Sequence, residues 1–318
     1  MSRVSDLVIR PYRDSDEDEV LPLLGASLGK TVDERYRRFF RWKHQENPFG
    51  RSFMWVGAVD GRIAGFRAFL RWRFISPDGE TVEAVRAVDT ATHPDFQGMG
   101  IFRTLTMNGL DEMREAGIQF VFNTPNDQSR PGYLKMGWEV EGRVPVGFRP
   151  RSLLALRRMI GARTAADNWS LPTSAGEPLG DLDLDELADP RPSAGSPRLV
   201  TDRSPAFLGW RYGACEAVSS RAIRIASGAA LVRFRQRGSA VECTVGDVIG
   251  TVSHRQAGHA IRRAMREGGA DYAIAGSVND IGGMLRSSRL GPIQTRRQLS
   301  DGANRLPLSL TLGDVEMF

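Results

Sequence analysis

Patterns of hydrophobic and polar positions divide the first half of the chain into short elements. Residues 8–12 predict a strand, and segments 14–29 and 33–45 have apolar positions at helical spacing. Residues 52–72 predict two strands joined by Asp60-Gly61, a dipeptide that tight hairpin turns favour. Residues 75–92 then predict a turn and a third antiparallel strand.

The pattern next alternates between helix and strand. A helix runs from residue 101 to about 116, where Gly117 can end it, and an apolar strand follows at 118–125. A loop with a short helix at 127–138 leads to a final strand at 138–148. This order predicts an α/β fold, with a mixed and mostly antiparallel sheet flanked by helices.

A glycine pair, Gly98 and Gly100, lies between the third antiparallel strand and the following helix, in the stretch HPDFQGMGIFRTL. Residues 97–102 offer consecutive backbone N–H groups at a helix start, which is an arrangement that binds phosphate. The dinucleotide-binding fingerprint would need glycine where Arg103 stands, and the Gly-Lys-Ser/Thr end of a P-loop is absent. The turn therefore predicts a diphosphate site of another kind.

Three segments, in this order, resemble the GNAT superfamily of acyl-CoA-dependent N-acyltransferases. IRPYRDSDEDEV resembles the family's first strand and helix, and THPDFQGMGIF resembles its Q/R-x-x-G-x-G/A loop. PNDQSRPGYLKMGWEVEG resembles its second signature, with Asn126 seven residues before Tyr133, followed by Gly137 and Trp138. The likeness covers residues 6 to 148.

The resemblance implies that acetyl-CoA or another acyl-CoA is the co-substrate. No metal is expected, because His44, His254 and His259 show no metal-ligand spacing with a carboxylate or cysteine partner. The strand ending at Thr90 and Thr92 would pair with the pantetheine arm, which Asn126 would also contact, and Tyr133 would lie near the thioester sulfur. The CoA pyrophosphate would bind the amides of Gln97, Gly98, Met99, Gly100, Ile101 and Phe102.

Acyl transfer to an amine needs a proton donor for the departing thiolate and a proton acceptor for the amine. Tyr133 is the candidate donor, because phenols and thiols lose their protons at similar pH; its alternative role is packing under Trp138. Asp89 and Glu83 lie six apart on one predicted strand, so we expect them to share a face and take a base or substrate role. Both could instead pair with arginines of other elements, or Glu83 could lie at a solvated strand start. His93 is expected to shape its loop.

The second half of the chain repeats the first faintly. FLGWR (207–211) echoes FFRWK (39–43), and MREGG (265–269) echoes MREAG (113–117). We predict a GNAT domain at 1–150 that binds acyl-CoA and is catalytic, a helix and linker at 151–200, and a degenerate GNAT-like lobe at 201–318. The second lobe lacks the signature residues, because Gly258 stands alone and Arg286 follows Asn279 at the position of the tyrosine.

Composition narrows the setting. Cys215 and Cys243 are the only cysteines, which argues against a disulfide scaffold or a zinc site and suits a reducing cytoplasm. Without an apolar run or signal core, we predict a cytoplasmic protein with no membrane partner. The net charge is +5, but the basic residues are spread along the chain, so nucleic acid is not expected to bind. An oligomer stays open.

The acceptor is the least determined feature. We expect a small-molecule primary amine, and the F-x-x-W pattern followed by Asn-Pro-Phe-Gly at 47–50 resembles GNAT-like proteins of sugar-nucleotide pathways. Arginines could hold an anionic acceptor, or could form a solvated helix face: Arg35, Arg37, Arg38 and Arg211. The alternatives are a protein amine as acceptor, a non-catalytic CoA-binding or scaffold module, and a transferase using charged tRNA, which the intact loop argues against.

Overall fold

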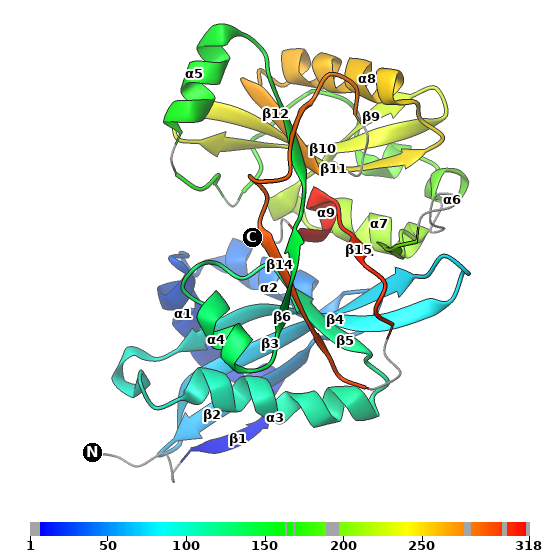
Figure 1. The fold of residues 1–318 in the computed structure, drawn as a ribbon. Coiled ribbons are helices and arrows are strands. Elements are labelled where there is room, and N and C mark those ends of the chain that lie inside the picture. The colour runs from blue at the N-terminus through cyan, green and yellow to red at the C-terminus, as the bar shows by residue number, and fades with distance from the viewer. Residues whose placement is uncertain are drawn as a thin grey trace. The chain divides into compact units, whose positions relative to one another are not determined.

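The computed structural model describes residues 7–162, 164–167, 169–188, 197–276, 281–300 and 304–315. The chain divides into two compact units. Unit 1 comprises Met1–Phe74, Thr81–Glu141 and Gln294–Arg305, and unit 2 comprises Ile75–Glu80, Gly142–Ile293 and Leu306–Phe318. Each unit is built around its own sheet, which we describe in turn (Figure 1).

In unit 1 the strands lie in the order β1-β2-β3-β4-β5-β14-β6. Their bounds are β1 (Val8–Pro11), β2 (Phe53–Val59), β3 (Arg62–Ile75), β4 (Thr81–Thr92), β5 (Phe120–Asn123), β14 (Ile293–Gln298) and β6 (Glu139–Arg143). The pairs β1–β2, β2–β3 and β5–β14 are antiparallel, whereas β4 and β5 are parallel. The predicted hairpin is confirmed, since Asp60 and Gly61 have φ of 50° and 79° between β2 and β3.

Helices cover the sheet of unit 1 on both faces (Figure 1). They are α1 (Glu17–Leu28), α2 (Glu34–Gln45), α3 (Ile101–Glu115) and α4 (Arg130–Lys135). The core beneath α3 and α4 contains Trp55, Phe69, Leu105 and Tyr133. Gly109 lets α3 approach closely, because a Cβ there would collide with the Trp55 ring.

In unit 2 the strands lie in the order β13-β7-β12-β11-β10-β9. Their bounds are β13 (Leu285–Ser287), β7 (Val146–Pro150), β12 (Tyr272–Gly276), β11 (Ala240–Gly250), β10 (Gly228–Arg237) and β9 (Arg221–Ile225). The short strands β8 (Leu199–Thr201) and β15 (Leu308–Ser309) pair with each other and belong to the nine-stranded sheet that contains β1. The helices are α5 (Leu153–Gly161), α6 (Leu184–Leu187), α7 (Pro205–Tyr212), α8 (His254–Glu267) and α9 (Leu312–Val315).

Unit 2 repeats the order of elements in unit 1. Its β11 and β12 are parallel and are joined through α8, as β4 and β5 are joined through α3. The echoed sequences lie at equivalent places, with FFRWK on α2 and FLGWR on α7. The predicted fold class, two mixed sheets flanked by helices, is confirmed.

One predicted strand is wrong. The segment 138–148 forms two strands, β6 and β7, which belong to different sheets. Pro145, which has no N–H to donate to a ladder, lies between them. The strand next to β5 in the sheet of unit 1 is instead β14, which comes from near the end of the chain.

The segment 151–200, predicted as a helix and linker, contains α5 and also a second helix, α6, and it ends within β8. Asn279, where the comparison with the first half placed an asparagine, lies outside the described residues. Among the helices that the structure describes, none has the length and apolar character needed to cross a membrane.

Candidate active site

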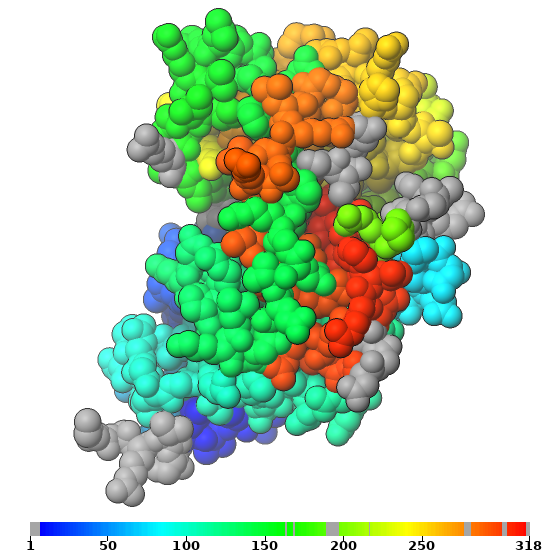
Figure 2. Space-filling view, in the orientation of Figure 1, coloured from blue at the N-terminus to red at the C-terminus, as the bar shows by residue number. Residues whose placement is uncertain are grey.

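The glycine turn leaves the N-terminus of α3 open. Gly98 and Gly100 have φ of 78° and 76°, which is the left-handed region that side chains rarely adopt. Gly100 is the N-cap of α3, and no side chain caps this helix. A Cβ on either glycine would meet no atom within 4 Å, so the space beside the turn is open. The segment projects at the surface of unit 1 (Figure 2).

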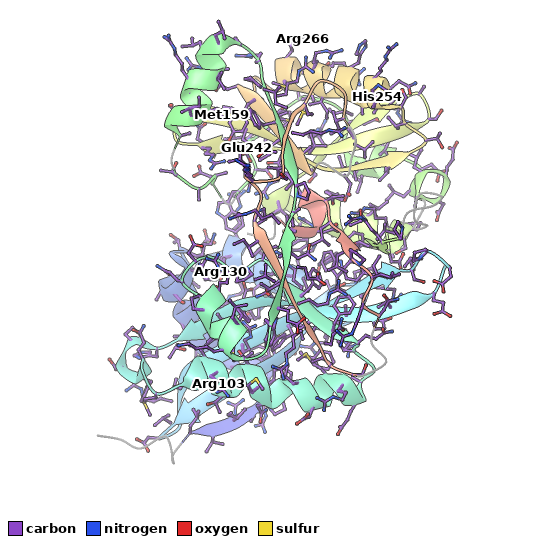
Figure 3. The ribbon with its side chains drawn as sticks, viewed as in Figure 1. Arg103, Arg130, Met159, Glu242, His254 and Arg266 are labelled. Atoms are coloured by element: carbon purple, nitrogen blue, oxygen red, sulfur yellow. The ribbon has the colours of Figure 1, made fainter. Side chains whose placement is uncertain are left out.

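Several N–H groups of this turn point to a ligand. The first helical hydrogen bond runs from the amide of Thr104 to the carbonyl of Gly100, at 3.0 Å. The amides of residues 98–103 have no acceptor among the described residues. Arg103 is on the first turn of α3, and Figure 3 shows it there. Open amides, the positive end of a helix and an exposed arginine favour an anion such as a diphosphate.

The corresponding helix of unit 2 is closed. Ser253 caps α8 by accepting from the amide of Gln256, and the Gln256 side chain accepts from the amide of Ser253 at 3.0 Å. This reciprocal capping engages two of the amides whose equivalents in α3 stay open. Of the two crossover helices, α3 is therefore the one whose N-terminus has no side-chain cap.

Next to the turn, β4 continues beyond its partner. Parallel pairing with β5 covers only Ala84 to Arg86, whereas β4 runs on to Thr92. Thr90 and Thr92 lie in this further part and are half-buried, and the Thr90 hydroxyl donates to the Phe66 carbonyl at 3.4 Å. The strand edge on the side of β5 is thus placed to pair with an extended ligand arm.

Tyr133 lies in α4 with only 3% of its surface exposed. Its ring meets Phe102 edge-on at a centroid distance of 5.5 Å and lies 5.2 Å from Trp138. Its hydroxyl oxygen accepts a hydrogen bond from Arg67 Nη2 at 2.7 Å. Tyr133 therefore packs against Trp138, and its hydroxyl is also hydrogen-bonded to Arg67 of β3.

Asn126 orders the turn that leads into α4. Its Oδ1 accepts from both the amide and the hydroxyl of Ser129, each at 2.9 Å, and its own carbonyl accepts from the amide of Arg130. The side chain is exposed, so its amide nitrogen can still reach a ligand.

Asp89 is held by two residues of α2. Lys43 Nζ is 2.9 Å from both carboxylate oxygens, and His44 Nε2 is 2.9 Å from one of them, while His44 Nδ1 contacts the Ser52 hydroxyl. Burial opposes ionisation of Asp89, but Lys43 and His44 outweigh it and hold the pKa of Asp89 well below its usual range. A carboxylate held in this way is a poor proton acceptor at neutral pH.

Glu83 lies at the other end of β4 and pairs with Arg73 at 2.8 Å, with 31% of its side chain exposed. The expectation that Glu83 and Asp89 share a face assumed strict alternation along β4. Val85 and Ala87 lie in the core under α3, yet Asp89 reaches α2, so that alternation is interrupted after Ala87. Strand irregularities of this kind redirect a side chain.

His93 Nδ1 accepts from the amide of Asp95 at 3.3 Å, at the start of the turn. The remaining functional contacts were not found from the sequence, namely Arg67 beside Tyr133, and Lys43 and His44 beside Asp89. For the α2 pair a signal existed, since Tyr36, Phe39, Phe40, Lys43 and His44 follow helical spacing on one buried face.

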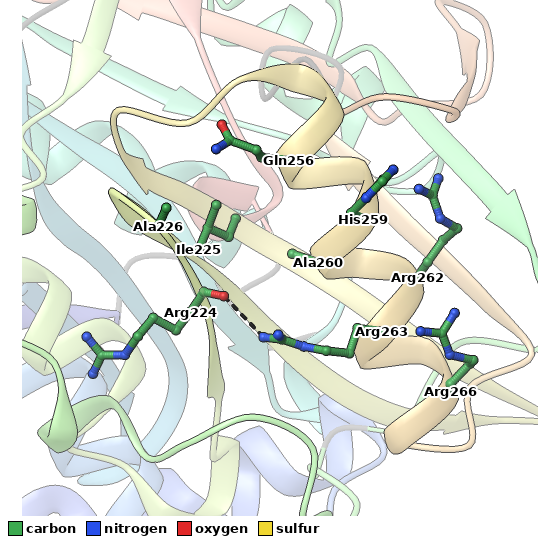
Figure 4. Close-up of a pocket in the computed structure, with 9 residues that line it drawn as sticks. All are labelled: Arg224, Ile225, Ala226, Gln256, His259, Ala260, Arg262, Arg263 and Arg266. Carbon is green, nitrogen blue, oxygen red and sulfur yellow. Dashed lines mark hydrogen bonds between the residues drawn. The ribbon is translucent and has the colours of Figure 1, made fainter.

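A cavity of about 500 Å³ lies in unit 2 between α8 and β9 (Figure 4). Its lining is dominated by arginines, and Arg263 donates to the carbonyl of Arg224 at 3.1 Å. Arg224 also pairs with Glu177, and Arg263 lies near Glu267. The cavity brings together no acid–base pair and no open helix terminus, so it does not resemble the site in unit 1. Within the described ranges, no group of three metal-ligating side chains is gathered.

Comparisons with known proteins agree with this geometry. The family model of the acetyltransferase (GNAT) domain matches residues 8–141, which include the turn, β4 and Tyr133. Over residues 8–141 the chain is therefore similar to GNAT acetyltransferase domains. The mycothiol acetyltransferase of Thermobifida fusca (strain YX) is 35% identical over 108 residues, which are 29% of this chain and 32% of that protein. The chain thus covers less than two thirds of that relative.

Solved structures match both units of the chain. A GCN5-related N-acetyltransferase from Anabaena variabilis has a TM-score of 0.61 and 12% identity, over 92% of this chain and 73% of that one. A GCN5-related N-acetyltransferase from Kribbella flavida has a TM-score of 0.57 and 14% identity, over 92% and 72%. At such identities the likeness is one of fold.

The Asp89 contacts predict a large effect on stability. Replacing Asp89 by Asn leaves the buried Lys43 ammonium without its counter-charge, so we expect the free energy of unfolding at pH 7 to fall by about 3–5 kcal/mol. Glu83→Gln on the same strand breaks a partly exposed pair and is expected to cost about 1 kcal/mol or less. Urea denaturation of the unmodified protein, Asp89→Asn and Glu83→Gln measures both losses. Equal losses in the two variants would contradict the different roles given to Asp89 and Glu83.

His44 predicts a pH dependence. Burial lowers the pKa of His44 below its ordinary 6.5, so the unfolded chain takes up a proton at a higher pH than the folded chain does. The contribution of His44 is therefore fully present above about pH 6.5 and is lost as pH falls through the folded pKa. We expect the free energy of unfolding to decline from pH 7.5 to 5.0 less steeply in His44→Gln than in the unmodified protein. Parallel slopes would show that His44 is not the group responsible.

Proposed function

We propose that the GNAT domain transfers an acyl group, most simply acetyl, from acyl-CoA to the primary amine of a small molecule. The observation that carries this proposal is the open N-terminus of α3, where two glycines leave the amides of residues 98–103 without acceptors among the described residues. A diphosphate supplies the negative charge and the acceptor oxygens that these amides lack.

The rest of the co-substrate fits the same edge of the sheet. The part of β4 that carries Thr90 and Thr92 would pair with the amides of the pantetheine arm, and the exposed side chain of Asn126 would contact that arm. The pyrophosphate would bind the amides of Gly98, Met99, Gly100, Ile101 and Phe102, whereas the amide of Gln97, which the sequence had included, donates to the Pro94 carbonyl at 3.3 Å. The support is the open ladder beyond Arg86 together with the open amides of the turn.

Bound acyl-CoA supplies an activated carbonyl and a thiol leaving group. A neutral amine attacks that carbonyl, a C–N bond forms, the C–S bond breaks, and the sulfur leaves as a thiolate that needs a proton. We assign Tyr133 as the donor of this proton, because its hydroxyl oxygen is engaged as an acceptor and its own proton has no described acceptor. The proton lost by the amine passes to water in this scheme.

Neither candidate carboxylate suits the base role. Asp89 has both oxygens held by Lys43, one of them also by His44, so it keeps its negative charge and does not take up a proton. Glu83 is six residues away along the strand, a separation of about 20 Å at strand geometry. We therefore propose that Asp89 fixes α2 against β4, and that Glu83 serves the surface pair with Arg73.

For the acceptor we keep an amino-sugar nucleotide as the leading small molecule, because it suits the net charge of +5. The relative named mycothiol acetyltransferase also favours a small molecule over a protein amine. A non-catalytic module that only binds CoA is the alternative, and it differs by showing binding without release of free thiol.

The glycine turn predicts a selective loss of binding. Gly100→Ala places a side chain at a φ of 76°, which strains the turn, and we expect acetyl-CoA to bind roughly tenfold more weakly. Gly117→Ala is the matched control, since Gly117 has φ of 80° in equally open space just beyond the other end of α3. Calorimetry with acetyl-CoA should give one site per chain. Equal weakening by both variants would place the co-substrate elsewhere, and two sites would show that unit 2 also binds it.

The donor role of Tyr133 predicts a loss in turnover. Removing the hydroxyl in Tyr133→Phe should lower kcat about 100-fold, with KM for acetyl-CoA changed less than about twofold. Free thiol released from acetyl-CoA is measured against a panel of primary amines that includes amino sugars and their nucleotides. Tyr12→Phe removes another hydroxyl of unit 1, one that has no partner among the described residues, and should leave kcat unchanged. Unaltered turnover in Tyr133→Phe would refute the assignment.

A further inference from the structure

A buried arginine lies directly behind the candidate proton donor. Arg67, on β3, has 0% of its surface exposed. Its guanidinium lies 4.4 Å from the ring centroid of Phe69 and 5.6 Å from that of Phe102, so it is surrounded by aromatic faces. No carboxylate of the described residues pairs with it. Burying a permanent positive charge without a counter-charge is costly, so this residue needs an explanation beyond packing.

The hydrogen bonds of Arg67 join two parts of the candidate site. Its Nη2 donates to the Tyr133 hydroxyl at 2.7 Å, and its Nη1 donates to the Val88 carbonyl at 3.1 Å. Val88 lies in the part of β4 beyond the ladder with β5, where the pantetheine arm is proposed to pair. One side chain thus fixes α4, which carries the donor, relative to that part of β4.

The direction of the bond to Tyr133 has a chemical consequence. A guanidinium can only donate, so the phenolic oxygen must accept, and its own proton has to point elsewhere. No described residue accepts that proton. A positive charge beside the oxygen also stabilises the negative charge that develops there as the proton leaves.

We propose that Arg67 is a positioning residue that holds the Tyr133 hydroxyl with its proton directed at the CoA sulfur and balances the charge left on the phenolic oxygen. The inference rests on the proposed function, in which Tyr133 protonates the thiolate. Arg67 itself is enclosed by protein and does not touch the substrate. Its proposed effect on proton transfer therefore passes through Tyr133, while its bond to the Val88 carbonyl positions β4.

A purely structural role makes a different prediction. If Arg67 only fills space and links β3, β4 and α4, its removal should harm turnover equally whether or not Tyr133 has a hydroxyl. If it acts through the hydroxyl, its removal should matter little once the hydroxyl is gone. A double-mutant cycle on kcat separates these two cases.

The cycle uses Arg67→Met, which keeps the length and apolar stem of the side chain, with Tyr133→Phe and the double variant. Thiol release from acetyl-CoA is measured with the amine panel. We expect Arg67→Met to lower kcat at least about 20-fold in the unmodified background, and less than about threefold in the Tyr133→Phe background. KM for acetyl-CoA should change less than about threefold throughout.

Arg86→Met provides the matched control. Arg86 is a buried arginine on the neighbouring strand β4, and its Nη2 contacts the Thr124 hydroxyl at 3.3 Å. Arg86→Met should change kcat by the same factor in the unmodified protein and in Tyr133→Phe. Thermal melting of every variant identifies those that fail to fold. If Arg67→Met does not fold, the same cycle is run with Arg67→Lys, which retains a donor and a charge and should give a smaller but still coupled loss.

Two outcomes overturn the inference, and they are distinguishable. If Arg67→Met lowers kcat by the same factor with and without the Tyr133 hydroxyl, Arg67 has a structural role only. The proposed function would still stand in that case. An unmodified protein that binds acetyl-CoA but releases no thiol with any amine would remove the reaction, and the role of Arg67 with it.

Discussion

The parallel pairing of β4 with β5 is the constraint on which the candidate site depends. Two parallel strands cannot be joined by a tight turn, so the chain must cross over, and here it does so through α3. The crossover brings the N-terminus of α3 to the carboxyl end of β4. Because β5 pairs with only three residues of β4, the same end of the strand also has backbone groups free of β5. A helix terminus for phosphate and a strand edge for an extended arm thus arise from one connection.

Charged side chains secure the part of β4 that lacks β5. On the side of α2, Asp89 binds Lys43 and His44, and on the side of α3 and α4, Arg67 binds the Val88 carbonyl. Buried groups of this kind add little net stability compared with apolar packing, but each is costly to leave unpaired. They therefore hold one arrangement of the strand. A site that must align a thioester with Tyr133 gains from such definition, since small displacements of reacting groups carry large losses in rate.

The local pattern of hydrophobic, polar and glycine residues was sufficient to predict most helices and strands of unit 1, and also the glycine turn before α3. The Asp60-Gly61 hairpin, the glycine pair and the order of helices and strands follow from rules that act over a few residues. The exchange of β7 and β14 between sheets did not follow, because an edge strand has the same local pattern whichever sheet it joins. The partners of Asp89 and Tyr133 were missed for a related reason. Lys43 is 46 positions from Asp89 and Arg67 is 66 from Tyr133, so only the fold brings them together.

Unit 2 shows which part of this arrangement is set by topology and which by the residues of the turn. Its β11, α8 and β12 repeat the parallel crossover, so a helix again starts at the end of a strand. There, however, the side chains of Ser253 and Gln256 cap the helix and satisfy two of its first amides, those of Gln256 and Ser253. Gly258 serves helix packing, since a Cβ on it would collide with the backbone of Gly282. The crossover alone therefore does not make a diphosphate site: the open amides require glycines at positive φ and the absence of a capping side chain, and unit 1 has both.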